Sequence, residues 1–432
     1  MIEWLDKYFG VREKGSSVQV ECLAGVSTFL ALSYIFIVNP AILSQAGMSK
    51  SHVLFATILT SAAATILMGL WAKLPFALAP GMEINAFIAF FVVGSLNYSW
   101  QQALGAVFWS GVLFVILTAL RLREKIIDAI PQQMKPGLSL CVGVFLCLVA
   151  LKIAGLLRYE GITLKGFGHP LGGGAIPLYL GLTLILLLEK FKVRGAVLLS
   201  IVVTSVFCHV TGTAIEAAYA APASGALFGG IGGIDLRVIF EPKMWSIILI
   251  LFFIDFYGSV AKLIGLTLST NILVGGRLPR MREALLIDGT ATTVGSVFGT
   301  SSIVVYVESA VGIGTGGRTG LTALICGLLM IASFLVTPLV ETIPLAATTG
   351  ALIFVAIKLC PPVAELLRFP KVDLFVLVTM QFIVIATFAI DHAMLVGFFL
   401  YTALDILARR APNPYLIGST ICLVLSLLLR LG

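Results

Sequence analysis

Two apolar stretches of the sequence carry charged and polar residues where a buried helix would be apolar. In the first, residues 75–81 (PFALAPG) are followed closely by Glu83 and Asn85. In the second, residues 299–306 (GTSSIVVY) lead to Glu308. A carboxylate accepts two N–H groups side by side, and an amide both donates and accepts. These side chains suit a flat heterocycle whose edge alternates N–H and C=O groups.

Each of these stretches is predicted to interrupt a helix. Two prolines and a glycine break the first stretch, and β-branched and hydroxyl-bearing residues fill the second. We therefore expect an extended piece followed by a half-length helix in both places. The first amide groups of such a helix have no partner within it, and its amino end is the positive end of its dipole. Two facing half-helices would thus present donors and polar side chains to one ligand.

The composition predicts that these stretches lie in a membrane. The 432 residues are 59% hydrophobic and 11% charged, and their mean hydropathy is +1.07, whereas soluble domains carry roughly 25% charged residues. Lipid leaves helices and closed barrels as the stable options. The apolar runs approach the roughly 20 residues of a spanning helix and lack the alternation of barrel strands. We predict an all-α polytopic membrane protein.

Motifs and charge exclude several other classes. The net charge of +7 comes from basic residues beside apolar segments, as the positive-inside rule expects, so nucleic acid is not an expected partner. The seven cysteines form no CxxC pair and the four histidines are dispersed, so we expect no metal and no cofactor. Neither HExxH nor GxSxG occurs, which disfavours an enzyme. GxxxxGK[ST] is also absent, so uphill transport would require an ion gradient.

The hydrophobic runs predict about fourteen membrane-spanning segments. They lie at roughly 19–39, 52–71, 75–94, 100–121, 136–156, 175–190, 194–212, 243–267, 283–298, 300–315, 319–341, 345–367, 372–390 and 392–408. The two breaks fall in the third and tenth segments. Interrupted segments at matching positions in two halves indicate the binding site of a transporter. Because each half has an odd number of crossings, we predict two inverted repeats of about seven segments each.

The basic residues predict the orientation. Clusters at 121–125, 190–194 and 277–282 face the cytoplasm if the N-terminus is cytoplasmic, and the opposite links hold few basic residues. We therefore predict a multi-pass protein of the cell inner (plasma) membrane with a cytoplasmic N-terminus. The surplus apolar segment 413–431 either crosses once more or lies in the interface, and we favour the interface.

Several sequence runs resemble a known family over nearly the whole chain. They include Ala24–Thr28, Leu278–Asp288, and above all 299–310 followed by 316–323 (GGRTGLTA). These runs resemble the nucleobase–cation symporter-2 (nucleobase–ascorbate) superfamily, specifically its adenine/guanine/hypoxanthine permease branch. The last two runs are long and unusual in composition, so the match is specific.

The resemblance implies a domain organisation and a mechanism. A core domain (19–121 and 243–341) would bind the substrate, and a gate domain (122–212 and 345–408) would support it and form a homodimer. Proton-coupled purine uptake would proceed by motion of the core against the gate. The family's third-segment asparagine falls on Asn85 and its tenth-segment glutamate on Glu308.

The eighth segment departs from the family pattern. A second acid of the family is replaced by Gly258, while Glu83 and Lys262 are additional charges. Positions 255, 258 and 262 share one helix face. We expect Lys262 to pair with Glu83, because an unpaired charge at that depth costs roughly 2.5–3.5 kcal/mol or more. The predicted substrate-binding residues are Glu308, Asn85, Glu83, Gly258, Ser259, Lys262, Tyr257, Asp255, Ser309 and Phe87.

Other roles remain open for several of these residues. Asn85 also fits interhelical hydrogen bonding, Asp255 fits a structural contact, and Lys262 fits snorkelling to the cytoplasmic face. Phe87 and Tyr257 are predicted stacking partners for a ring.

The sequence favours a secondary active transporter of a purine-type nucleobase, coupled to H⁺. The alternative is a carrier of another small solute, such as an organic or inorganic anion, because of Gly258 and Lys262. A membrane-embedded enzyme lacks a recognisable nucleophile or metal cluster, and a channel would not need a gate domain. The expected partners are a nucleobase-like small molecule, membrane lipid and a second copy of the chain.

Overall fold

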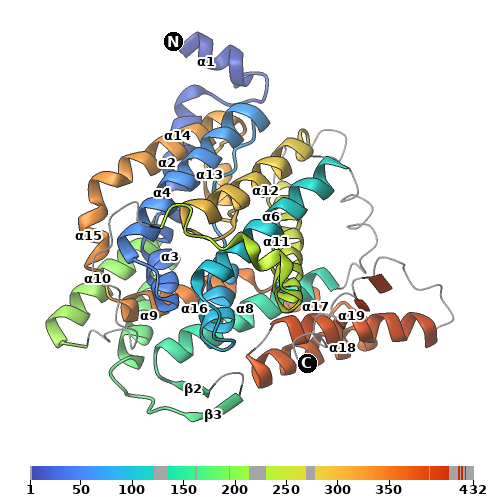
Figure 1. Ribbon diagram of the computed structural model, residues 1–432. Helices are drawn as coiled ribbons and strands as arrows, with labels where there is room; N and C mark the ends of the chain where they lie inside the picture. Colours follow the sequence, from blue (N-terminus) through green and yellow to red (C-terminus); the bar gives the residue numbers. More distant parts are fainter. Residues whose placement is uncertain are drawn as a thin grey trace.

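The computed structural model describes residues 2–120, 134–160, 163–193, 195–213, 230–268, 278–388 and 390–407, with residues 417, 418, 420, 421 and 424. The first half contains α1 (Ile2–Phe9), α2 (Val18–Leu32), α3 (Ile35–Leu43), η1 (Ser44–Ala46), α4 (Lys50–Leu67), η2 (Met68–Ala72), β1 (Leu78–Pro80), α5 (Met82–Ala86), η3 (Phe87–Val93), α6 (Trp100–Ala119), α8 (Met134–Ile153), β2 (Leu157–Glu160), β3 (Thr163–Phe167), α9 (Ala175–Lys190) and α10 (Ala196–Thr211). The second half contains η4 (Leu236–Phe240), α11 (Pro242–Leu268), α12 (Met281–Phe298), β4 (Ile303–Val305), α13 (Ser309–Gly314), α14 (Gly320–Ala332), η5 (Ser333–Val336), α15 (Thr337–Glu341), η6 (Leu345–Thr348), α16 (Thr349–Leu359), α17 (Val363–Leu366), α18 (Lys371–Thr387) and α19 (Ile390–Leu407). Figure 1 shows their arrangement.

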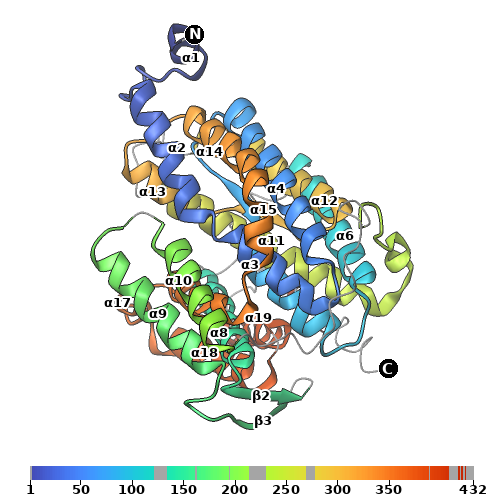
Figure 2. The same cartoon turned by 90° about the vertical axis from the view of Figure 1, so that its left-hand side faces the viewer.

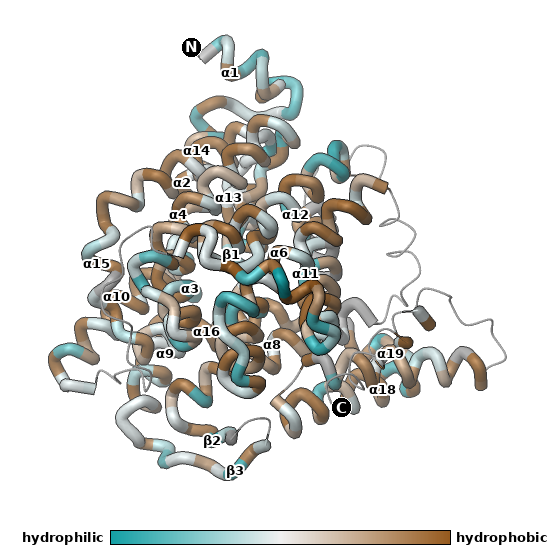
Figure 3. Tube along the Cα trace, in the orientation of Figure 1, coloured by the Kyte–Doolittle hydropathy of each residue, from teal (hydrophilic) through white to brown (hydrophobic). Residues whose placement is uncertain are grey.

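The described chain is mostly helical, which confirms the predicted all-α polytopic membrane protein. Within the described residues, 4 helical stretches are long and apolar enough to cross a membrane: Val18–Ala46, Lys50–Ala72, Trp100–Ala119 and Gly320–Val340. Shorter apolar helices of 10–17 residues accompany them. Apolar residues run along most of the helices in Figure 3, while α1 and several links are more hydrophilic. Most of the surplus segment 413–431 lies outside the described residues.

The predicted breaks in the third and tenth segments are confirmed. Strand β1 pairs with β4 in antiparallel register, with Ala79 opposite Val304. The amide of Gly81 extends the ladder by donating to the Ser302 carbonyl at 2.9 Å. A short helix follows each strand, α5 after β1 and α13 after β4. The two broken segments therefore meet inside the molecule and cross where β1 of one pairs with β4 of the other.

Local chemistry explains why these residues leave the helix. Pro75 and Pro80 have no N–H to donate and clash with a preceding helical turn, while residues 303–305 (IVV) are β-branched and favour extended backbone. Within a membrane every backbone group needs a partner inside the protein. Pairing one interrupted segment with the other satisfies those groups. Beyond α5 the chain continues as the π-helix η3, a form that is often found at functional sites.

The helices pack in two groups. The first group contains α2 to α6 and α11 to α14, and the second contains α8 to α10, α16, α18 and α19. Figure 2 shows the first group above the second, with the β2–β3 hairpin at the lower edge. Glycines allow close helix approach within each group: a Cβ on Gly320 would lie 2.0 Å from the Gly69 carbonyl oxygen, and one on Gly350 would lie 2.5 Å from the Leu182 amide. Any larger residue there would force the helices apart.

Candidate substrate site

A cavity lies where the two broken segments meet the second helix group. Its walls enclose about 270 Å³ that no atom fills, part of it open to solvent. The lining residues are Tyr34, Met82, Glu83, Lys262, Tyr306, Val307, Glu308, Val355 and Leu359. Val355 and Leu359 belong to α16, and the other residues belong to the first helix group. Both groups therefore form the walls.

Side chains, more than helix-end amides, define the polar part of this cavity. The first amides of α13 are already used: Ser309 N donates to the Tyr306 carbonyl at 3.2 Å, and Ala310 N donates to the Val307 carbonyl at 3.0 Å. The expected row of open donors at the start of this half-helix is thus absent. A tight turn ahead of α13 supplies the acceptors that the helix itself lacks.

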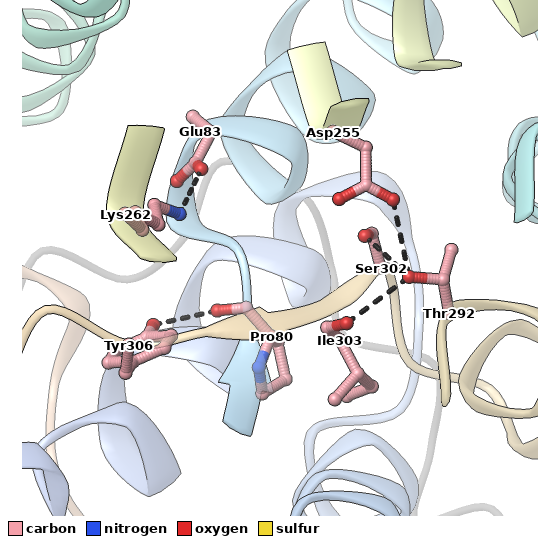
Figure 4. Close-up of polar contacts among 8 residues, drawn as sticks. All are labelled: Pro80, Glu83, Asp255, Lys262, Thr292, Ser302, Ile303 and Tyr306. Atoms are coloured by element: carbon pink, nitrogen blue, oxygen red, sulfur yellow. Dashed lines mark hydrogen bonds and ion pairs between the residues drawn. The ribbon is translucent and has the colours of Figure 1, made fainter. Parts of the chain in front are cut away.

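Glu83 and Lys262 form an ion pair on the cavity wall. Lys262 Nζ lies 2.7 Å from Glu83 Oε1, and the two side chains are 9% and 7% exposed. Figure 4 shows Glu83 of α5 and Lys262 of α11 pointing toward each other. The predicted pairing is confirmed, and it has a clear cause, because either charge alone at this depth would be costly. A Cβ on Gly258 would lie 3.8 Å from Glu83 Oε1, so this glycine leaves space beside the pair.

Glu308 contributes a second carboxylate to the cavity wall. Tyr34 Oη donates to Glu308 Oε1 at 2.6 Å. Glu308 Oε2 is buried and has no hydrogen-bond partner within the described residues. The neighbouring Tyr306 hydroxyl donates to the Pro80 carbonyl at 2.7 Å (Figure 4), which ties the tenth segment to the third. One carboxylate oxygen beside the cavity is therefore left without a partner among the described residues.

Asp255 lies behind the cavity, in a polar cluster that holds β4. Thr292 Oγ1 donates to Asp255 Oδ2 at 3.3 Å and lies 2.9 Å from Ser302 Oγ. The same hydroxyl lies 3.2 Å from the Ile303 carbonyl oxygen. Figure 4 shows this cluster apart from the Glu83–Lys262 pair. Asp255 is buried and does not line the cavity, so its position favours the structural contact.

Asn85 is used in a buried amide network. It donates to Asn39 Oδ1 at 2.5 Å and accepts a hydrogen bond from Ser301 Oγ. Asn39 in turn donates to Thr57 at 2.5 Å and to Thr300 at 3.1 Å. This chain links the first, second, third and tenth segments. Asn85 therefore braces the strand crossing, as the interhelical alternative predicts.

Among the remaining predicted residues, Ser309, Phe87 and Ser259 do not line the cavity. Ser309 Oγ accepts from the Ala77 amide at 3.0 Å, and the Phe87 ring stacks on Phe91 with centroids 5.0 Å apart. Ser259 is fully buried, and its hydroxyl has no partner within the described residues. The Tyr257 side chain lies outside the described residues. Substrate contact by these four side chains stays a prediction.

Six of the nine lining residues were missed by sequence reasoning: Tyr34, Met82, Tyr306, Val307, Val355 and Leu359. Nothing in the spacing of Tyr34 points to Glu308, 274 positions away. Val355 and Leu359 are ordinary apolar residues of a spanning segment. Their role depends on which face of α16 meets the first helix group, and a single apolar segment does not reveal that face.

Comparison with known proteins decides the family. The sequence model of the permease family matches residues 19–365, which is most of the chain. The chain belongs to the nucleobase–ascorbate permease family. The resemblance inferred from the motifs is thereby confirmed, and the permease is a multi-pass membrane protein, not an enzyme.

The permease is similar to curated relatives and, in its fold, to a solved structure. Adenine permease AdeP of Escherichia coli is 36% identical over 84% of this chain and 81% of that protein. Guanine/hypoxanthine permease PbuO of Bacillus subtilis is 34% identical over 80% of this chain and 82% of that protein. The transmembrane domain of the cyanobacterium bicarbonate transporter BicA aligns with a TM-score of 0.64 at 15% identity, covering 88% of this chain and 97% of that one. This last likeness shows the fold, an inverted-repeat transporter.

Proposed function

We propose that the permease carries purine-type nucleobases across the cytoplasmic membrane. The observation that supports this most is the cavity between the two helix groups, where Glu308 offers a carboxylate oxygen and Lys262 an ammonium. Groups of both kinds match the alternating N–H and C=O edge of a nucleobase. The relatives named as adenine and guanine/hypoxanthine permeases agree with this substrate class.

Transport would follow from motion of one helix group against the other. In this proposal, residues 19–121 and 243–341 form a core domain, and residues 122–212 and 345–408 form a gate domain. The cavity leaves about 20 Å³ for the centres of water-sized molecules, far below the roughly 300–1,000 Å³ of typical small-molecule sites. The two groups would therefore have to separate to admit a base, and separation on one side of the membrane and then on the other would alternate access.

Coupling, assembly and orientation complete the proposal. Because no nucleotide-binding motif occurs in the sequence, uphill uptake would draw on an ion gradient, and a proton is the proposed ion since the cavity holds titratable carboxylates. The permease would act as a homodimer in the plasma membrane, with its N-terminus in the cytoplasm, as the distribution of basic residues indicates.

A small-anion carrier is the second proposal, and Lys262 is the observation that favours it. The cavity wall, however, carries two carboxylates, Glu83 and Glu308, against one ammonium. Its formal charge is therefore negative. Lys262 is also already paired with Glu83. A neutral polar base fits this balance better than an anion.

Ligand-induced thermal stabilisation of the purified permease tests the substrate class. Purine bases should stabilise the protein by about 2.7 kcal/mol at a concentration 100-fold above Kd. Glu308→Gln should lose most of this effect, because it removes the charged acceptor. Glu189→Gln is the matched control, since Glu189 forms an exposed ion pair with Lys358. Stabilisation by bicarbonate or sulfate, with none by purines, would instead support the anion carrier.

Uptake into proteoliposomes tests the coupling separately. With an inward proton gradient, radiolabelled purine should accumulate above its equilibrium level, and a protonophore should abolish the accumulation. Equal uptake with and without the gradient would contradict proton coupling while leaving the nucleobase substrate intact.

A further inference from the structure

The cavity wall carries a hydrogen-bond donor and a hydrogen-bond acceptor that come from two different elements. Lys262 lies on α11 and Glu308 at the start of α13, and both line the cavity. This inference rests on the proposed function: if the permease carries purines, Lys262 and Glu308 would contact one edge of the base. The relatives leave this open, since they are named for adenine in one case and for guanine and hypoxanthine in another.

Lys262 is held as a donor to the cavity. An ammonium has three N–H groups, and within the part of the chain that the structure describes, Glu83 Oε1 accepts one of them at 2.7 Å. The pair also fixes the direction of a side chain that is otherwise long and flexible. Two N–H groups therefore remain for a ligand with two neighbouring acceptors.

Glu308 is held as an acceptor. Its Oε1 already accepts from Tyr34, and its buried Oε2 has no partner among the described residues. A buried carboxylate oxygen without a partner carries a desolvation penalty. A ligand N–H placed against this oxygen would remove the penalty, whereas a ligand acceptor placed there would increase it.

We propose that the permease selects 6-oxopurines over adenine and that Lys262 determines this specificity. A 6-oxopurine carries the acceptors O6 and N7 side by side, the pair that lysine and arginine bind in guanine. Its N1–H lies on the other side of O6 and would donate to Glu308. Adenine in the same orientation turns its amino group toward Lys262 and its N1 acceptor toward Glu308. If adenine is turned over, its N1 accepts from Lys262 and its amino group donates to Glu308. The atom next to N1 is C2–H, which cannot accept the second N–H group of Lys262, so one of the three contacts is lost.

Gly258 and Glu83 contribute space and charge balance to this arrangement. The glycine leaves open the space next to Glu83 Oε1, where a Cβ would lie at 3.8 Å. Glu83 balances the Lys262 charge, so the site does not require an anionic base. Lys262 would therefore distinguish the bases by its hydrogen bonds, and not only by its positive charge.

The test compares affinities of the full-length permease for three bases. Hypoxanthine should bind at least about fivefold more tightly than adenine, which corresponds to the loss of one good contact. The analogue 7-deazahypoxanthine, which lacks the N7 acceptor, should also bind about fivefold more weakly than hypoxanthine. This series uses the unmodified protein, so it does not depend on whether a variant folds.

Variants then assign the preference to Lys262. The double variant Glu83→Gln/Lys262→Met removes the pair without leaving an unpaired charge, and its hypoxanthine-to-adenine preference should shrink toward one. Lys190→Met is the control, since Lys190 is exposed at the end of α9, and its preference should be unchanged.

Two results would overturn the inference while the proposed function stands. One is adenine binding as tightly as hypoxanthine in the unmodified permease. The other is a folded double variant that keeps the full preference. If no purine binds the unmodified permease and small anions do, the proposed function itself fails.

Discussion

Gly258 lies on α11 one turn before Lys262, and its missing side chain shapes the cavity. A methyl group there would make ordinary van der Waals contact with Glu83 Oε1, at 3.8 Å. Anything larger would push against the ion pair. Elsewhere on the cavity wall, the Tyr34 hydroxyl donates a 2.6 Å hydrogen bond that holds Glu308 in place. The polar lining of the cavity thus depends on a few side chains and on the absence of one at Gly258.

At this scale, we predict opposite outcomes for two substitutions of Gly258. Gly258→Ala should keep purine affinity nearly unchanged, because the added carbon has room. Gly258→Leu should weaken binding about tenfold or more, since overpacking costs about 1–3 kcal/mol. Binding isotherms of the two variants check this. Equal affinities in both would show that the space beside Glu83 is not used by the ligand.

At the scale of elements, the loop between α13 and α14 is anchored by a carboxylate from another helix. Glu21 of α2 is fully buried and accepts from the Arg318 amide at 2.9 Å, the Thr319 amide at 3.3 Å and the Thr322 hydroxyl at 2.5 Å. It therefore caps the start of α14 from outside. The run 316–323 carries the family resemblance, and its acceptor lies almost three hundred residues earlier.

Loss of this cap should destabilise the permease. Glu21→Ala leaves several buried donors unsatisfied, so we predict a loss of at least about 2 kcal/mol in unfolding free energy. Thermal unfolding in detergent measures it. Glu3→Ala provides the comparison, because Glu3 is exposed in α1. A melting temperature equal to that of the Glu3 variant would refute the capping role.

At the scale of the whole molecule, the cavity belongs to both helix groups. Met82 and Tyr306 come from the crossing of the broken segments, and Leu359 comes from α16. A ligand held here touches surfaces that the proposed mechanism moves relative to each other. Substitutions of apolar lining residues in the second helix group should therefore change the substrate affinity.

Leu359 provides the test of this shared site. Leu359→Trp should fill the cavity from the gate side and lower purine affinity at least about tenfold, whereas Leu359→Ala should bind within a few-fold of the unmodified protein. Both variants keep an apolar residue at a partly buried position, so folding should be retained. Unchanged affinity in the tryptophan variant would place the substrate elsewhere.

The sequence by itself determined the features that depend on local chemistry. Low charge and long apolar runs require helices in lipid. Proline at 75 and 80 breaks one of those helices because it cannot continue a helical turn. The β-branched run at 303–305 favours extended backbone and is held there by pairing with β1, since the same run at 201–203 is helical in α10. The charge of Glu83 and Lys262 also predicted their pairing, since a lone charge at that depth is too costly. The family follows from the same runs.

Only the tertiary structure decided which polar residues line the cavity. Asn85, Ser309 and Asp255 belong to the same segments as Glu83, Glu308 and Lys262, yet they turn toward the strand crossing and satisfy it. The pairing of β1 with β4 sets this division, because every buried donor and acceptor near the crossing needs a partner. Those partners come from segments far apart in the sequence, so spacing along the chain does not reveal them. The contribution of α16 depends in the same way on how two helix groups pack.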